Sequence, residues 1–511
     1  MTGLLIKNCR LEGLGTGSVY SEAGRIVKVS EEATQNVPEG TEILDAGGGS
    51  LVPGLIDSHC HPFEYGWLKR NIDLRGTTNM TGVRLRLYSG IQKAKPDEWV
   101  TGMGWDQETF SDRRMPNRFD IDDVSPDNPV ALSRICGHIA LLNGRAIEAL
   151  RFQERVGSEY ERSPAGELTG IVKEAALAEV FERVPRSPER AAADLQSVEV
   201  EAGRLGLTTL HCILSPEGFA EELEALAVLH SSGSLSIRFR VYIPPKAMDY
   251  VEGKGLRKKM SNDRVRLNGV KIYADGSLGA RTAALREPYS DDPSNRGILR
   301  QSDGELAALV ERIDAKGYQA IIHAIGDRAV EQAIDALAGV AGAKNPKRHR
   351  IEHASLLPKD LRSKMVHHGI RATVQPLFIT SDTWAADRLG SERALDLYPL
   401  KSMLEEGVVA SGSSDSPVES MSPVLGMWGS MVRAGLAPDE SLTLTEALGL
   451  YTSNAASNGF DETGSSLVEG GRADMTLLDS DVGGMHPALF RKVGVAATVA
   501  DGFAIHSFVG A

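Results

Sequence analysis

Two histidines, spaced two residues apart, end a segment that otherwise has the pattern of a buried strand. The stretch LVPGLIDSHCHP begins at Leu51 with apolar residues and ends with His59 and His61. Side chains two apart on a strand point to the same face, so we expect both imidazoles to project from one strand end. Such a pair suits a divalent metal ion. Asp57 is expected to orient a ligand histidine rather than to bind metal itself.

Eight short strand-like segments follow one another along the chain. They are SLVPGLIDSH, GLTTLHCIL, LSIRFRVYI, VRLNGVKIYADG, GYQAIIHAIGD, RHRIEHASL, GIRATVQP and GVVASGSSDSPV. Amphipathic stretches that close near a glycine helix stop lie between most of them. Eight alternating units predict an α/β fold with a parallel (β/α)8 TIM barrel rather than an open sheet.

Two regions fall outside this alternation. Residues about 63–190 separate the first and second strands, and this length, far beyond that of a βα loop, predicts an inserted subdomain. We expect it to fold over the C-terminal rim and wall a pocket. Short strand-like segments near both termini predict one small β-sandwich domain. The expected boundaries are 1–50 and 461–511 for the sandwich and 51–460 for the barrel.

Further polar residues stand at the same end of the predicted strands. Strand four carries Lys271, strand five His323, strand six His353 and strand eight Asp415. Catalytic residues of such barrels lie at the C-terminal strand ends. A lone histidine there is more often structural, but several imidazoles and a carboxylate on one rim form a ligand set for zinc or a similar ion.

Motifs along most of the chain resemble the amidohydrolase superfamily, and within it the YtcJ-like branch (amidohydrolase family 3). The matching segments, in order from about residue 50 to 480, are PGLIDSHCHP, GWDQETF, GHIALLNG, VKIYADGSLGARTAAL, HAIGDRAV, RIEHASL, SGSSDSPV and LVEGGRADMTLLD. The resemblance implies a (β/α)8 barrel with a β-sandwich built from the two termini, as the strand count indicates independently.

The resemblance also implies individual roles. His59 and His61 would bind a more buried metal, and His323 and His353 a more exposed one. Asp415 would be the catalytic aspartate that also touches the buried metal. One or two divalent ions are expected, zinc first, although imidazole and carboxylate ligands also accept manganese, iron or cobalt.

Lys271 matches a lysine that is carboxylated in many relatives and bridges two metals. A lysine ammonium has no lone pair for a metal at neutral pH, so Lys271 can be a bridging ligand only as a carbamate. As an unmodified amine, its role would be electrostatic or structural. Both alternatives stay open.

This ligand set predicts hydrolysis by metal-activated hydroxide. A bound ion lowers the pKa of water toward about 7 and polarises a carbonyl. Asp415 would take the water proton and pass it to the leaving amine. A neutral histidine would stabilise the developing oxyanion, and His353 and His138 are the other expected catalytic residues. The predicted reaction cleaves a C–N bond of the amide, N-acyl or N-formyl type.

Two other functions remain in competition. The same scaffold could carry a metal-dependent lyase or decarboxylase, which carbon dioxide release would distinguish from amine release. A regulatory protein without chemistry is the second alternative. Such relatives usually lose metal ligands, whereas all six ligand positions are present here.

Substrate contacts are expected from a second group of residues. Trp105 and Asp106 lie in GWDQ, where packing of the indole is the alternative. Arg281 follows a glycine-rich bend and would orient a substrate carboxylate or brace its loop. Gln375 ends strand seven toward the same rim, and His211 ends strand two near the site.

The composition limits the partners. Net charge is −13, from 56 basic and 69 acidic residues without a basic run, which argues against nucleic acid and anionic membranes. No secretory signal or membrane span is evident, and four scattered cysteines favour a reducing cytoplasm. A small-molecule substrate is expected, and a homodimer is left open. The cysteines are Cys9, Cys60, Cys136 and Cys212.

Overall fold

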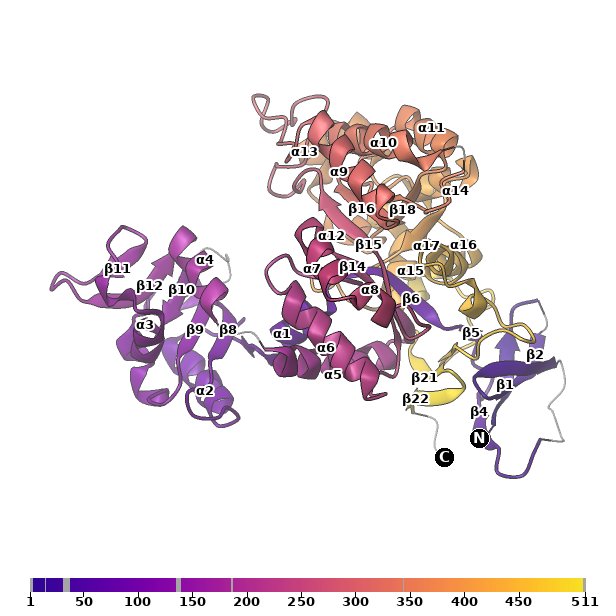
Figure 1. The fold of residues 1–511 in the computed structure, drawn as a ribbon, viewed down its shortest axis with the longest axis horizontal. Helices are drawn as coiled ribbons and strands as arrows, with labels where there is room; N and C mark the ends of the chain where they lie inside the picture. Colours follow the sequence, from indigo (N-terminus) through magenta and orange to yellow (C-terminus); the bar gives the residue numbers. More distant parts are fainter. Residues whose placement is uncertain are drawn as a thin grey trace. The chain divides into compact units, whose positions relative to one another are not determined.

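The computed structural model describes residues 3–13, 15–30, 37–134, 139–184, 187–342 and 344–508. The chain divides into two compact units, Met1–Tyr65 with Ala192–Ala511, and Gly66–Ala191. The first unit holds the barrel and both chain ends, and the second spans most of the segment assigned above to an insert (Figure 1).

The predicted eight-stranded parallel barrel is confirmed. Its hydrogen-bonded order is β19-β18-β17-β16-β15-β14-β13-β6, and every neighbouring pair is parallel. The strands are β6 (Leu55–Cys60), β13 (Leu207–Ile213), β14 (Arg238–Ile243), β15 (Val265–Tyr273), β16 (Gln319–Ala324), β17 (Arg350–His353), β18 (Arg371–Val374) and β19 (Ala410–Gly412). Helices that follow these strands include α6 (Phe219–Ser231), α9 (Asp303–Ala315), α10 (Asp327–Ala341), α11 (Lys359–His368), α14 (Leu400–Glu406) and α17 (Ser453–Asn458).

The barrel closes through the chain beyond β19 rather than through β19 itself. The amide of Asp415 donates to the carbonyl of His59 at 2.9 Å, and the amide of His61 donates to the carbonyl of Ser416 at 2.8 Å. The buried carboxylate of Asp57 accepts from the amides of His59 and Ser414. The first and last strands therefore meet where the predicted site residues lie.

Strand one is shorter than predicted because the chain changes sheets at Gly54. Residues Leu51–Pro53 form β5, which pairs with β20 (Met475–Leu478) outside the barrel, and β6 begins only at Leu55. A Cβ at Gly54 would lie 2.7 Å from Cγ2 of Thr208 and 2.9 Å from Cβ of Asp474. Only glycine fits where the strand passes these two side chains.

Gly54→Ala should therefore destabilise the fold. Overpacking of a tight interior position costs about 1–3 kcal/mol, which a denaturant titration of the free energy of unfolding would measure. Gly304→Ala is the control, because no heavy atom lies within 4 Å of its added Cβ and the position is helical. An equal stability of the two variants would contradict the steric argument.

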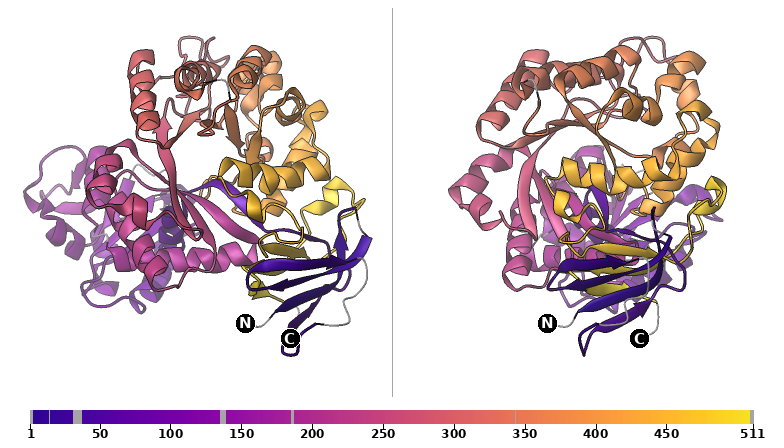
Figure 2. Two further views of the ribbon diagram at one scale, coloured as in Figure 1. Left: turned by 45° about the vertical axis from the view of Figure 1, so that its right-hand side comes forward. Right: turned by 90° about the vertical axis from the view of Figure 1, so that its right-hand side faces the viewer.

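The chain ends form two four-stranded sheets, which lie side by side in both views of Figure 2. One has the order β3-β2-β1-β4 and the other β22-β21-β20-β5. A shared core of buried side chains joins them, with Ile6 and Val19 from one sheet and Leu477 and Val499 from the other. The remaining strands are β1 (Leu4–Leu11), β2 (Gly15–Glu22), β3 (Arg25–Ser30), β4 (Glu42–Asp45), β21 (Val495–Ala500) and β22 (Phe503–Ser507).

The second unit contains a six-stranded sheet of order β11-β12-β10-β9-β8-β7. Its strands are β7 (Ile72–Asp73), β8 (Val100–Trp105), β9 (Val130–Arg134), β10 (Ile139–Leu142), β11 (Tyr160–Arg162) and β12 (Leu168–Lys173), with helices α2 (Met80–Ile91), α3 (Gly144–Leu150) and α4 (Glu174–Arg183). Within the described parts of the whole chain, no helix has both the length and the apolar character needed to cross a membrane.

Candidate functional site

Two imidazole nitrogens and one carboxylate oxygen form the centre of the candidate site. Nε2 of His59 lies 3.3 Å and Nε2 of His61 lies 3.2 Å from the same atom, Oδ1 of Asp415. The potential ligand atoms of these three residues all lie within 4.8 Å of one another. Asp415 has a φ of 54°, a left-handed conformation that is uncommon outside glycine. The structure thus brings together the histidine pair of strand one and the aspartate that follows strand eight.

Asp415 is ionised in this setting. Burial alone would raise the pKa of its carboxyl, but the imidazoles of His59 and His61 hold that pKa well below its usual range. The ionised form is acceptor-only, as a metal ligand or a proton acceptor must be.

Glu352 was not identified from the sequence, yet it contacts the most buried ligand candidate. Its Oε2 is hydrogen-bonded to Nδ1 of His59, while its Oε1 accepts from Nε of Arg350 at 2.6 Å. Burial would raise the pKa of Glu352, but Arg350 and His59 hold it well below its usual range. The signal was present in RIEH, because residues two apart on a barrel strand share a face and two buried charges must pair.

Lys271 lies beside the histidine pair. Its Nζ is 3.3 Å from Nε2 of His59 and 5.0 Å from the ring centre of Tyr273, the next residue on the same face of β15. Burial lowers the pKa of Lys271 to about 8, although Glu352 and Asp415 act in the opposite direction. A larger share of neutral amine is therefore present at neutral pH than for an exposed lysine.

His353 ends β17 with a φ of 73°, and a buried amide fixes its ring. Oε1 of Gln375 lies 2.8 Å from Nδ1 of His353, and Nε2 of Gln375 donates to Oγ of Ser413, which donates to the carbonyl of Val374. This chain of donors leaves Gln375 Oε1 as an acceptor, so Nδ1 of His353 carries the proton. Burial and the neighbouring His323 lower the pKa of His353 well below its usual range, which keeps the ring neutral.

These contacts bear on two of the expected roles. A neutral His353 protonated on Nδ1 has only a lone pair on Nε2, so it suits a metal ligand and not a donor to an oxyanion. Gln375 is buried and hydrogen-bonded to His353 and Ser413, so it orients the His353 ring, and its expected contact with substrate stays a prediction.

His323 stacks edge-on against His353, with ring centres 4.4 Å apart. Its Nε2 lies 3.0 Å from the carbonyl of Gly276, which can only accept, so Nε2 carries a proton. Oδ1 of Asp275 lies 3.4 Å from the same Nε2 of His323. The Asp275 carboxylate also accepts from the backbone amides of Ala284, Ile325 and Gly326. Among the described residues, neither His323 nor His353 belongs to the compact ligand group formed by His59, His61 and Asp415.

Asp57 and His211 lie next to the site without entering it. Asp57 accepts from the backbone amide of His59, not from its ring, and burial raises the pKa of Asp57 to about 7. The orienting role expected of Asp57 therefore falls to Glu352. His211 is fully buried, with Nδ1 3.4 Å from Nη1 of Arg350.

The predicted substrate contacts are engaged by other groups of the protein within their own units. Trp105 is buried in the core of the second unit and donates to the carbonyl of Leu132, which is the packing role given above as the alternative. Asp106 pairs with Arg134. Arg281 pairs with Asp291 at 2.9 Å, and this ion pair braces the loop after β15. His138 lies outside the described residues.

The residues present fit a divalent metal ion. The Nε2 atoms of His59 and His61 face the same oxygen of an ionised carboxylate, and these three potential ligand atoms form a set that suits zinc. Lys271 could bridge two ions only as a carbamate, because an ammonium offers no lone pair.

Comparisons with known proteins show the family of this chain. The sequence profile of the amidohydrolase family matches residues 42–506. YtcJ of Bacillus subtilis (strain 168), which is named as an amidohydrolase, is 30% identical to this chain over 512 residues. The match covers 96% of each chain. An N-substituted formamide deformylase from Arthrobacter pascens is 26% identical over 516 residues, 95% of this chain and 94% of that protein. An uncharacterized metal-dependent hydrolase from Pyrococcus furiosus has a crystal structure with a TM-score of 0.82 at 30% identity, covering 94% of this chain and 99% of that one. This chain belongs to the amidohydrolase family.

Proposed function

We propose that this protein is a metal-dependent hydrolase of C–N bonds in small organic amides, with N-formyl and N-acyl amines as the substrate class. The carrying observation is the meeting of His59, His61 and Asp415 around one point at the barrel rim. Similarity to the N-substituted formamide deformylase supports the choice of amide. A divalent ion held there would lower the pKa of water and polarise a carbonyl.

The other steps of the proposed reaction are assigned to individual residues of this chain. Asp415 is an ionised carboxylate beside both histidines, placed to accept a proton from the attacking water and to return it to the leaving nitrogen. His59 and His61 would hold the ion, and their Nε2 atoms are the ring nitrogens that face Asp415. His353, neutral and protonated on Nδ1, presents an acceptor nitrogen to the same rim.

A substrate panel tests the proposal. Zinc-loaded protein is given N-substituted formamides, N-acyl amines, esters and lactones, with amine and carbon dioxide release followed separately. We expect amine release from the formamides or acyl amines and none after chelation. Carbon dioxide release without amine would assign a lyase or decarboxylase, and inactivity of metal-loaded protein across the panel would favour a regulatory role.

We further propose that Lys271 becomes N6-carboxylated when metal is bound. The lowered pKa of about 8 supplies neutral amine, the form that attacks carbon dioxide to give a carbamate and a proton. Glu352 and Asp415 are carboxylates whose negative charges act on Lys271. They would repel a carbamate anion at this position, so the carbamate requires positively charged metal ions to offset that repulsion. Protein equilibrated with ¹³C-bicarbonate should show a carbamate resonance only with metal present, and Lys271→Ala should lack it. Metal-loaded wild-type protein without that resonance would leave Lys271 an amine in a one-metal site.

A further inference from the structure

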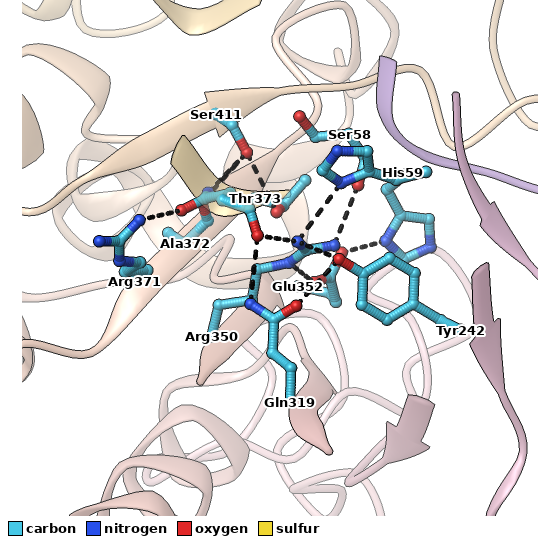
Figure 3. A network of polar contacts seen from close by, with 12 residues as sticks. Ser58, His59, Tyr242, Gln319, Arg350, Glu352, Arg371, Ala372, Thr373 and Ser411 are labelled. Carbon is cyan, nitrogen blue, oxygen red and sulfur yellow. Dashed lines mark hydrogen bonds and ion pairs between the residues drawn. The ribbon is translucent and has the colours of Figure 1, made fainter. Parts of the chain in front are cut away.

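A single buried carboxylate, Glu352, serves two donors beneath the candidate metal site. One oxygen accepts from Nε of Arg350 at 2.6 Å, and the other is hydrogen-bonded to Nδ1 of His59. Figure 3 shows this line of contacts from Arg350 through Glu352 to the imidazole. All three side chains are at most 1% exposed, so water does not compete for these hydrogen bonds.

Arg350 is itself held from several sides of the barrel interior. Its Nη1 donates to the hydroxyl of Tyr242 at 2.9 Å and its Nη2 to the carbonyl of Ser58, the residue before His59, at 3.1 Å (Figure 3). The guanidinium also lies 4.7 Å from the ring centre of Tyr242. The hydroxyl of Tyr242 in turn donates to Oε1 of Gln319 at 2.9 Å. Strands β6, β14, β16 and β17 thus fix the position of the guanidinium.

We infer that Glu352, held in place by Arg350, is a positioning residue that keeps the proton of His59 on Nδ1 and so directs the Nε2 lone pair to the metal. The inference rests on the metal site of the proposed function. A carboxylate without a proton can only accept, so the shared proton belongs to His59. Nε2 then faces Asp415 at 3.3 Å and Nζ of Lys271 at 3.3 Å, two groups placed around the expected ion.

Glu352→Gln should disrupt the two hydrogen bonds from Arg350 and His59 while keeping the side-chain shape. Arg350 and His59 both donate to Glu352, and a carboxylate offers each an oxygen, whereas an amide has only one. If Arg350 takes that oxygen, the amide NH₂ faces Nδ1 of His59, which must then accept, and the ring proton moves to Nε2. The nitrogen nearest Asp415 would no longer have a free lone pair.

Metal affinity is the readout, because turnover alone would not separate positioning from other defects. Zn²⁺ affinity is measured by chelator competition, and Co²⁺ absorption reports the ligand geometry. Loss of an outer partner of a ligand histidine typically costs about 10- to 100-fold in metal affinity, so we expect that loss and an altered Co²⁺ spectrum for Glu352→Gln. Unchanged affinity and spectrum would overturn the inference.

Asp461→Asn is the matched control. Asp461 is also a buried carboxylate paired with buried arginines, Arg240 at 2.7 Å and Arg472 at 2.8 Å. This variant should lose stability and keep wild-type Zn²⁺ affinity. An equal loss of affinity in both variants would mean that general destabilisation explains the effect, and the inference would fail.

A second variant covers the case in which Glu352→Gln does not fold. Arg350→Met/Glu352→Leu removes both charges together, a replacement that buried ion pairs often tolerate. The folded double variant should show the same loss of Zn²⁺ affinity, and wild-type affinity would overturn the inference. Zn²⁺ binding by the wild type and its turnover of amides test the proposed function separately, whereas the ratio of variant to wild-type affinity tests Glu352 alone.

Discussion

Asp415→Asn is expected to lower kcat by about 10²- to 10⁴-fold, the usual contribution of general acid–base catalysis. In free energy this is roughly 3–5 kcal/mol of barrier, at about 1.36 kcal/mol per tenfold change in rate. Asparagine keeps the shape and still offers an oxygen near Nε2 of His59 and His61, but it cannot take a proton from water. The backbone contact that closes the barrel, from the Asp415 amide to the His59 carbonyl, is retained.

Metal content decides how this result is interpreted. Oδ1 of Asp415 lies 3.2 Å from Nε2 of His61 and belongs to the same ligand group, so a variant that has lost its ion would mimic lost catalysis. Rates are therefore compared per bound metal. Asp382→Asn is a suitable control, because that carboxylate binds the hydroxyl of Tyr398 and not the histidines. Full metal occupancy with near-normal kcat in Asp415→Asn would assign the base elsewhere, and His138 would be tested next.

The strand pattern predicted the barrel because the signals for each strand and helix lie within short stretches of sequence. Most βα units have their own apolar strand, amphipathic helix and glycine stop, and the parallel arrangement follows from their alternation. The break at Gly54 was not predicted, although Pro53-Gly54 is a dipeptide that commonly marks a turn. The break depends on Thr208 and Asp474, which lie more than 150 and 400 residues further along the chain.

The candidate ligands were predictable by position, but their partners were not. His59, His61 and Asp415 follow from strand ends that share one rim. The proton positions of His59 and His353 depend on Glu352 and Gln375, contacts between different strands that no spacing rule encodes.

The substrate contacts were the least predictable part, because a polar residue in a motif can be engaged by the protein itself. Arg281 illustrates this point, since its guanidinium pairs with Asp291 ten residues later in the same loop. Trp105 illustrates it also, because the indole is in a core and donates to a carbonyl. Such roles depend on how loops pack, which amino-acid type and spacing alone leave open.

Replacing both His59 and His61 with alanine should abolish tight metal binding. The two imidazoles supply two of the three donors in the compact ligand group, so Asp415 alone would remain. The loss of affinity should exceed the about 10- to 100-fold that removal of an outer partner costs. Elemental analysis of protein purified with zinc should find metal in the wild type and none in the double variant.

The control for this experiment must remove two histidines without touching the barrel interior. His367 and His368 are adjacent on α11, with ring centres 4.7 Å apart, and neither is buried. His367→Ala/His368→Ala should keep wild-type occupancy, which separates specific ligation from adventitious binding by surface imidazoles. Because the His59 ring is buried against Glu352, its double variant must also be shown to be folded before the metal count is compared. A folded His59→Ala/His61→Ala protein with unchanged zinc would place the metal away from these histidines, and the roles assigned to Asp415 and Glu352 would fail with it.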